Sequence, residues 1–97
     1  MKFEDLEFVP HTGDRNGIAA TAYFANGRGA SVIRHKKSWG HEEGLYELAV
    51  VRGAADGASK LDMSTPITDD VIGWLTPDDV TALLNRIAEL PAPEEED

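Results

Sequence analysis

The sequence predicts an α+β domain in which an antiparallel sheet of four to five strands packs one face against a C-terminal helix. Strand-like segments fill the first two thirds of the chain, and short turns rich in glycine and asparagine separate them. The long stretch with helical periodicity comes last. Short connections join antiparallel neighbours, and strands followed by a helix are typical of the α+β class.

The expected strands precede the helix and are separated by turn signals. They are residues 3–9, 18–24, 30–36, 45–52 and 60–65. Pro10 is expected to end the first strand. Asn26 and Gly27 form the pair that a type I′ hairpin turn prefers, so the second and third strands should form a hairpin. The sequence leaves open the strand order and the sheet face that the helix covers.

The expected helix begins after Thr76, whose hydroxyl is suited to accept a hydrogen bond from the first turn. Pro77 takes the first helical position, and Asp78 and Asp79 follow at the positive end of the helix dipole. One apolar stripe recurs at helical spacing and consists of Val80, Leu83, Leu84 and Ile87. Pro91 is expected to stop the helix.

A second capped turn is expected just upstream, where Thr68 precedes Asp69 and Asp70 and the turn runs to Trp74. Four aspartates would then lie at two successive helix starts. Acids at helix N-termini are also ordinary capping and dipole chemistry, so a purely structural role stays open.

Length and composition indicate one domain over residues 1–90, followed by a disordered acidic tail over residues 91–97. The chain has no cysteine, which excludes disulfides, thiol nucleophiles and cysteine-ligated metals. Its first residues are acidic and lack a long apolar run, and no stretch is long enough to cross a bilayer. We therefore expect a cytoplasmic protein without a membrane partner.

The charge is strongly one-sided along the chain. Residues 1–61 contain eight acidic and eight basic residues, whereas residues 62–97 contain ten acids and only Arg86, which accounts for the net charge of −9. A negative surface repels nucleic acid and complements the basic grooves of proteins that bind it. The simpler alternative is that the acidity only keeps a small protein soluble.

Positive charge is concentrated between residues 28 and 37, which include four basic residues and no acid. Together with nearby aromatic residues this segment could form a nucleic-acid patch, but the overall charge argues against direct nucleic-acid binding. Among those aromatics, Trp39 lies in a glycine-containing loop and is expected at a partner contact.

The chemistry-bearing residues predict neither catalysis nor metal binding. His11, His35 and His41, with Glu42 or Glu43, match no metal-ligand spacing. No serine or threonine occupies a nucleophile elbow, and the glycines near residue 27 do not open a helix as a phosphate cradle does. We expect a non-enzyme with no catalytic residue, no metal and no cofactor.

Two runs, residues 44–51 and 65–76, carry a resemblance to small uncharacterised proteins encoded by bacteriophages and prophages. The likeness covers most of residues 17–90 and brings no catalytic motif. In size, acidity and lack of chemistry, the chain is more loosely similar to anti-CRISPR proteins, several of which occupy nucleic-acid sites on Cas proteins.

Two functions are then expected from different classes. In the first, the chain is an inhibitor made by a mobile element. It binds a basic nucleic-acid-binding groove of a host protein, such as a Cas effector subunit, as a monomer or weak dimer. Carboxylates would replace phosphates, and the partner-binding residues would be Asp69, Asp70, Asp78, Asp79, Glu42, Glu43 and Trp39. In the second, it is a small structural or housekeeping module that self-associates through its sheet.

Overall fold

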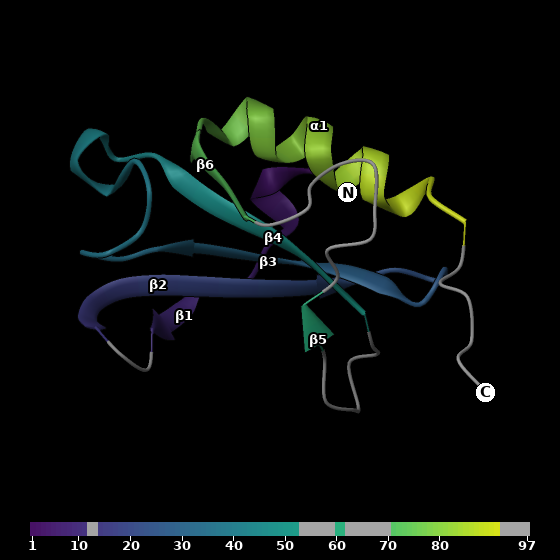
Figure 1. Cartoon of the computed structure of the whole chain (residues 1–97), viewed down its shortest axis with the longest axis horizontal. Coiled ribbons are helices and arrows are strands. Elements are labelled where there is room, and N and C mark those ends of the chain that lie inside the picture. The colour runs from purple at the N-terminus through teal and green to yellow at the C-terminus, as the bar shows by residue number, and fades with distance from the viewer. Residues whose placement is uncertain (12–13, 53–59, 62–70, 92–97) are drawn as a thin grey trace.

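A computed structural model describes residues 1–11, 14–52, 60–61 and 71–91 of the chain (Figure 1). The elements in chain order are η1 Phe3–Asp5, β1 Val9–His11, β2 Asp14–Tyr23, β3 Arg28–Arg34, η2 His41–Glu43, β4 Tyr46–Arg52, β5 Lys60–Leu61, β6 Val71–Leu75 and α1 Pro77–Ala88. Among these elements, no helix has both the length and the apolarity needed to span a membrane.

The strands form one antiparallel sheet with α1 on one of its faces (Figure 1), so the predicted fold class is confirmed. The order is β1-β2-β3-β4, and two short strands share the outer side of β4. β6 pairs with its first half, whereas β5 pairs with Val51 and Arg52. The sheet therefore has six strands but is five strands wide.

The helix follows its local signals closely. Thr76 Oγ1 accepts a hydrogen bond from Asp79 N at 3.1 Å, and Asp79 Oδ2 accepts one from Thr76 N at 3.0 Å, which makes a reciprocal capping box. Pro77 takes the first position, as predicted. The predicted apolar stripe is the buried side of α1 and consists of Val80, Leu83, Leu84 and Ile87.

The core lies between this stripe and the strands β3 and β4. Ala30 and Val32 from β3, and Leu48 and Val50 from β4, are fully buried there. Their alternating partners along each strand point to the opposite face of the sheet, because side chains in a strand alternate between the two faces. The helix therefore covers one face only.

The predicted first strand over residues 3–9 is wrong, because the chain forms η1 at Phe3–Asp5 and enters the sheet only at Val9. Long-range contacts hold this turn in place. Phe3 N donates to Thr81 Oγ1 of α1 at 2.9 Å, and the Phe3 ring lies 5.0 Å from that of Tyr46. Pro10 does not end the strand but lies within β1, an edge strand that tolerates its missing N–H.

The predicted hairpin between β2 and β3 is confirmed, but its turn is not of type I′. Such a turn needs positive φ at both central residues. Gly27 has a φ of 80°, whereas Asn26 is not among the described residues with positive φ. Instead, the Asn26 side chain donates to the carbonyls of Ile87 and Leu90, at 2.8 and 2.9 Å, and so caps the C-terminal end of α1.

The predicted capped turn from Thr68 to Trp74 is wrong where it can be compared, because Val71–Leu75 forms strand β6. Pairing with β4 explains the difference, since Val71 and Ile72 are β-branched and align with Ala49 and Leu48. Asp69 and Asp70 lie outside the described residues, as do residues 62–65 of the predicted last strand and residues 92–97 of the predicted tail.

Candidate functional site

The two tryptophans of the chain lie side by side at the surface. Trp39 is 57% exposed and Trp74 is 55% exposed, and their ring centroids are 5.3 Å apart with the planes tilted by 36°. Tryptophan is usually well buried, and neighbouring exposed tryptophans are typical of interaction surfaces. The only other large hydrophobic side chains of comparable exposure among the described residues are Met1 and Val9.

A β-bulge presents Trp74. At one point of the ladder, β6 contributes Gly73 and Trp74 where β4 contributes only Glu47. Trp74 has a φ of 55°, and it is the only non-glycine residue with positive φ in the described part of the chain. A left-handed conformation costs an L-residue about 1–2 kcal/mol. Bulges of this kind re-aim side chains, so the strain here accompanies an outward-facing indole.

The loop between β3 and β4 brings Trp39 against this bulge. Trp74 N donates to the carbonyl oxygen of Trp39 at 3.2 Å. Trp39 N in turn lies 3.4 Å from Glu47 Oε1, at the long end of a hydrogen bond. These contacts hold the backbones of the two tryptophans next to each other.

Two glycines allow this close approach. A Cβ on Gly73 would overlap with Trp39 Cβ and lie 3.2 Å from Trp39 Cγ. Gly40 has a φ of 92°, and a Cβ there would lie 2.9 Å from Trp74 Cα. A larger residue at either position would push the loop away from β6 and separate the two rings.

The pair lies on the sheet face that α1 leaves uncovered. Tyr46 and Leu48 belong to the core beneath the helix, so Glu47 between them points to the other face. Glu47 is only 9% exposed, and it holds the backbone of Trp39 on that side.

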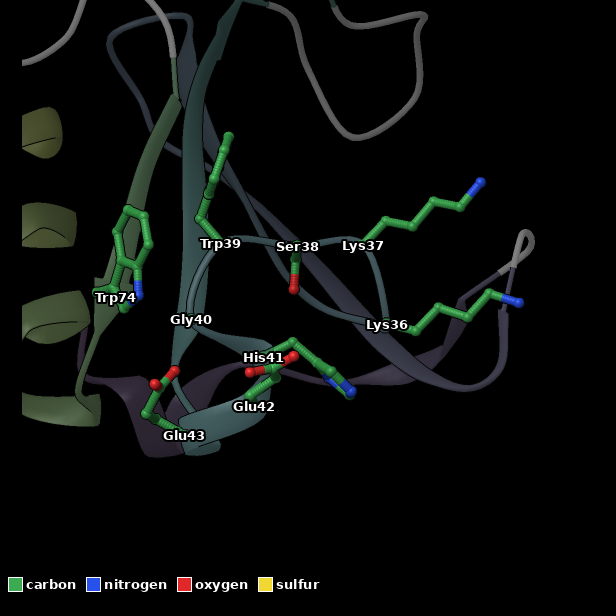
Figure 2. A pocket seen from close by; sticks show the side chains of 9 residues that line it. All are labelled: Lys36, Lys37, Ser38, Trp39, Gly40, His41, Glu42, Glu43 and Trp74. Carbon is green, nitrogen blue, oxygen red and sulfur yellow. The ribbon is translucent and has the colours of Figure 1, made fainter.

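A hollow of about 360 Å³ opens beside the pair and is lined by residues 36–43 and Trp74 (Figure 2). Glu42 and Glu43 enter it from η2, and both are exposed. The side chains of Lys36 and Lys37 extend away from the indoles (Figure 2). His41 also lines the hollow, and its Nδ1 is buried without a hydrogen-bond partner. The hollow therefore offers aromatic surface and carboxylates together.

Three of the predicted partner-binding residues, Trp39, Glu42 and Glu43, meet in this hollow. Asp78 and Asp79 are exposed on the first turn of α1, on the other layer of the fold. The carboxylate of Asp79 is already engaged in the capping box. Asp69 and Asp70 lie outside the described residues.

The two described acidic groups nevertheless share one end of the sheet. Tyr46, the first residue of β4, pairs with Leu75, the last residue of β6. The chain therefore enters β4 and leaves β6 at the same end of the sheet. η2 lies just before Tyr46, and α1 begins just after Leu75. The predicted acidic surface is divided between two layers that meet at this end.

The sequence reasoning missed Trp74, because it assigned this residue to a helical turn. A signal was present in the run from Ile72 to Leu75, where a lone glycine interrupts an apolar segment. An isolated glycine in a strand pattern indicates a bulge or a close backbone approach, and Gly73 provides both.

The alternative basic patch is largely turned inward. Arg28 is 8% exposed and its Nε donates to the carbonyl of Pro91 at 2.9 Å. The guanidinium of Arg34 lies over the ring of Tyr46, 5.0 Å from its centroid. Lys36 and Lys37 are the two exposed members of this patch.

The histidines do not form one cluster around a metal. His11 and His35 lie ring to ring, with centroids 4.2 Å apart, whereas His41 lines the hollow. The described part of the chain contains no group of three histidine or carboxylate side chains placed to hold a metal ion.

Comparison with known proteins gives no match to a family model, a curated protein or a solved structure. The features that bear on function are therefore the geometry of the hollow, the charge of the chain and the resemblance carried by its sequence.

Proposed function

We propose that the protein is a non-enzymatic binding protein that docks on a positively charged surface of a host nucleic-acid-binding protein and blocks it. The observation that carries this proposal is the pair of exposed indoles beside the exposed carboxylates of Glu42 and Glu43. The resemblance to phage proteins makes a Cas effector subunit the first partner to test.

The tryptophans would supply most of the affinity. A tryptophan buries about 150–250 Å² in a packed environment, and slightly more than half of each tryptophan residue is exposed here. Covering both would remove about 170–280 Å² from water, which is worth about 4–7 kcal/mol before the cost of association. That amount suits an anchor at the centre of an interface, with further contacts around it.

The carboxylates would supply steering and specificity. The net charge of −9 attracts a cationic surface, and added salt reduces the distance over which this attraction acts. Glu42 and Glu43 would lie where the partner binds phosphates, whereas exposed Asp78 would add to the field from the same end of the sheet. Asp69 and Asp70 belong to the proposal through their charge alone.

The test is capture of partners from a host lysate on the immobilised chain, followed by affinity measurements with the purified partner. Trp39→Ala should weaken binding by about thirtyfold or more, as expected for a central hot spot. Val9→Ala is the matched control, because Val9 has the same exposed fraction, 57%, on the edge strand β1.

The inhibitory mechanism has its own readout. Adding the chain should release nucleic acid from the partner, and Glu42→Gln with Glu43→Gln should weaken this release more at low salt than at high salt. Glu89→Gln is the control, because it also removes a negative charge. Glu89 directly follows α1, and it lies about 18 Å from the start of that helix. A complex that keeps its nucleic acid, or that is indifferent to these charges at low salt, would exclude the mechanism.

A second candidate is self-association through the sheet face opposite α1. Three cross-strand rows lie on that face: Ala19–Ile33–Glu47, Thr21–Ser31–Ala49 and Tyr23–Gly29–Val51. Glu47 is their only charged residue, and depletion of charge is typical of interface cores. This function predicts a dimer in light scattering that persists at high salt and is abolished by Thr21→Lys, a change at an exposed position of β2.

A further inference from the structure

Building on the proposed function, we infer that the hollow beside the tryptophans is a recognition site for an arginine side chain of the partner. The guanidinium would lie against the exposed face of an indole, and its N–H groups would donate to the carboxylates of Glu42 and Glu43. If the proposed function fails, this site has no assigned partner, so the test below separates the two.

The hollow has the size and lining for this occupant. Its volume, about 360 Å³, is at the lower end of the range for small-molecule pockets and suits one side chain. Aromatic surface and carboxylates line the same space, whereas the two lysines extend away from the indoles (Figure 2). A cation is therefore favoured over an anion at the aromatic end.

Arginine suits this arrangement better than lysine does. Its guanidinium is planar, is weakly hydrated, stacks on aromatic faces and presents several N–H donors in one plane. Lysine offers a compact, strongly hydrated charge that stacks poorly. Two carboxylates next to a flat aromatic surface match the first geometry, because stacking and hydrogen bonding then act in different directions.

The chain already uses this chemistry within itself. The Arg34 guanidinium carbon lies 5.0 Å from the centroid of the Tyr46 ring, and Arg34 Nη1 donates to the Tyr46 hydroxyl at 3.2 Å. One guanidinium of this chain therefore combines an aromatic contact with a hydrogen bond, between β3 and β4 on the core side of the sheet.

The backbone around the pair indicates a surface formed for contact. Trp74 keeps a left-handed φ of 55° while leaving 55% of its side chain exposed. Neither feature stabilises the fold, and both place an aromatic face at the opening of the hollow. Local strain combined with exposure is typical of positions that serve binding.

The experiment is a fluorescence titration of the full chain, whose two tryptophans are both in this site. The probes are three short peptides that differ at one central position, which is arginine, lysine or citrulline. Citrulline has nearly the shape of arginine but no charge. The arginine peptide should change the tryptophan emission and bind about tenfold tighter than the citrulline peptide, with lysine between them.

Variants locate the response. Glu42→Gln with Glu43→Gln should weaken binding of the arginine peptide about threefold, and Trp39→Phe should reduce it further, since phenylalanine is the weaker cation–π partner. Glu89→Gln should change nothing. A single-stranded oligonucleotide and a neutral oligosaccharide are the competing ligands, and both should bind more weakly than the arginine peptide.

Each outcome decides the inference. Equal binding of the arginine and citrulline peptides, no saturable response, or tighter binding of the oligonucleotide or oligosaccharide would overturn the arginine site. If the chain still captures a cationic partner in that case, the proposed function survives without it. If the arginine peptide binds as expected but no cationic protein is captured, the proposed function fails and the arginine site stands.

Discussion

Gly73→Ala is the sharpest perturbation of the tryptophan pair. A methyl group on Gly73 would overlap with Trp39 Cβ, and real Cβ atoms essentially never approach another heavy atom more closely than 3.0 Å. Trp39 is held by backbone contacts to Trp74 and Glu47, so it has little room to yield. The loop must therefore move away from β6, and the two rings must separate.

The size of the effect follows from two opposing terms. Overpacking of this kind costs about 1–3 kcal/mol. Replacing glycine by alanine also restricts the unfolded chain, which stabilises the folded state by about 0.4–1 kcal/mol. We expect a net loss of about 1–2 kcal/mol, and for a domain of this size each kcal/mol lowers the melting temperature by about 4–8 °C.

The assay combines thermal unfolding with far-ultraviolet circular dichroism, because two indoles that lie close together at a tilt give an exciton couplet. Gly73→Ala should lose both stability and the couplet. Gly44→Ala is the matched control: it has a φ of 72° and no atom within 4 Å of an added Cβ, so it should cost about 1–2 kcal/mol and keep the couplet. An unchanged couplet and melting temperature in Gly73→Ala would refute the described contact.

Three further substitutions test the fold by chemical denaturation. Leu84→Ala should cost about 2–5 kcal/mol, because Leu84 is fully buried between α1 and the sheet. Thr76→Ala should cost about 1 kcal/mol through loss of the capping box with Asp79, and Thr76→Ser should restore most of it. Asn26→Ala should cost about 1–3 kcal/mol, because it removes the two hydrogen bonds that Asn26 donates to the carbonyls of Ile87 and Leu90. Losses below about 0.5 kcal/mol in any of the three would contradict the contact concerned.

The helix could be predicted from the sequence because its signals are local. Thr76, Pro77 and the apolar stripe lie within one segment and specify its start and its buried side. The hairpin at Gly27 was also predicted from a local signal. Its turn type was not, because the Asn26 side chain caps the C-terminal end of α1. Local chemistry thus determined the element and a distant contact determined its detail.

The errors fall where distant segments decide the structure. Residues 3–5 form a turn rather than a strand because Phe3 contacts Thr81 and Tyr46. Residues 71–75 form a strand because the outer edge of β4 accepts them. The sequence suggested one acidic surface, but Glu42 and Glu43 lie on η2 in the loop between β3 and β4, whereas Asp78 and Asp79 lie in the first turn of α1.

The candidate site shows the same division. Trp39 was expected at a contact because a glycine-containing loop carries it, and the two glutamates were expected there as carboxylates that replace phosphates. Trp74 completes the pair through a bulge and a backbone hydrogen bond between segments far apart in the chain. No local pattern specifies such a contact.

The measurement that tests the central claim most directly is a magnetic resonance titration of the isotope-labelled chain with the partner that it captures. The chain has two tryptophans, and each contributes one indole N–H signal. Both signals should shift or broaden as the complex forms, whereas the backbone amide of Val9 on β1 should not. A tight complex in which both indole signals remain where they were would contradict the account.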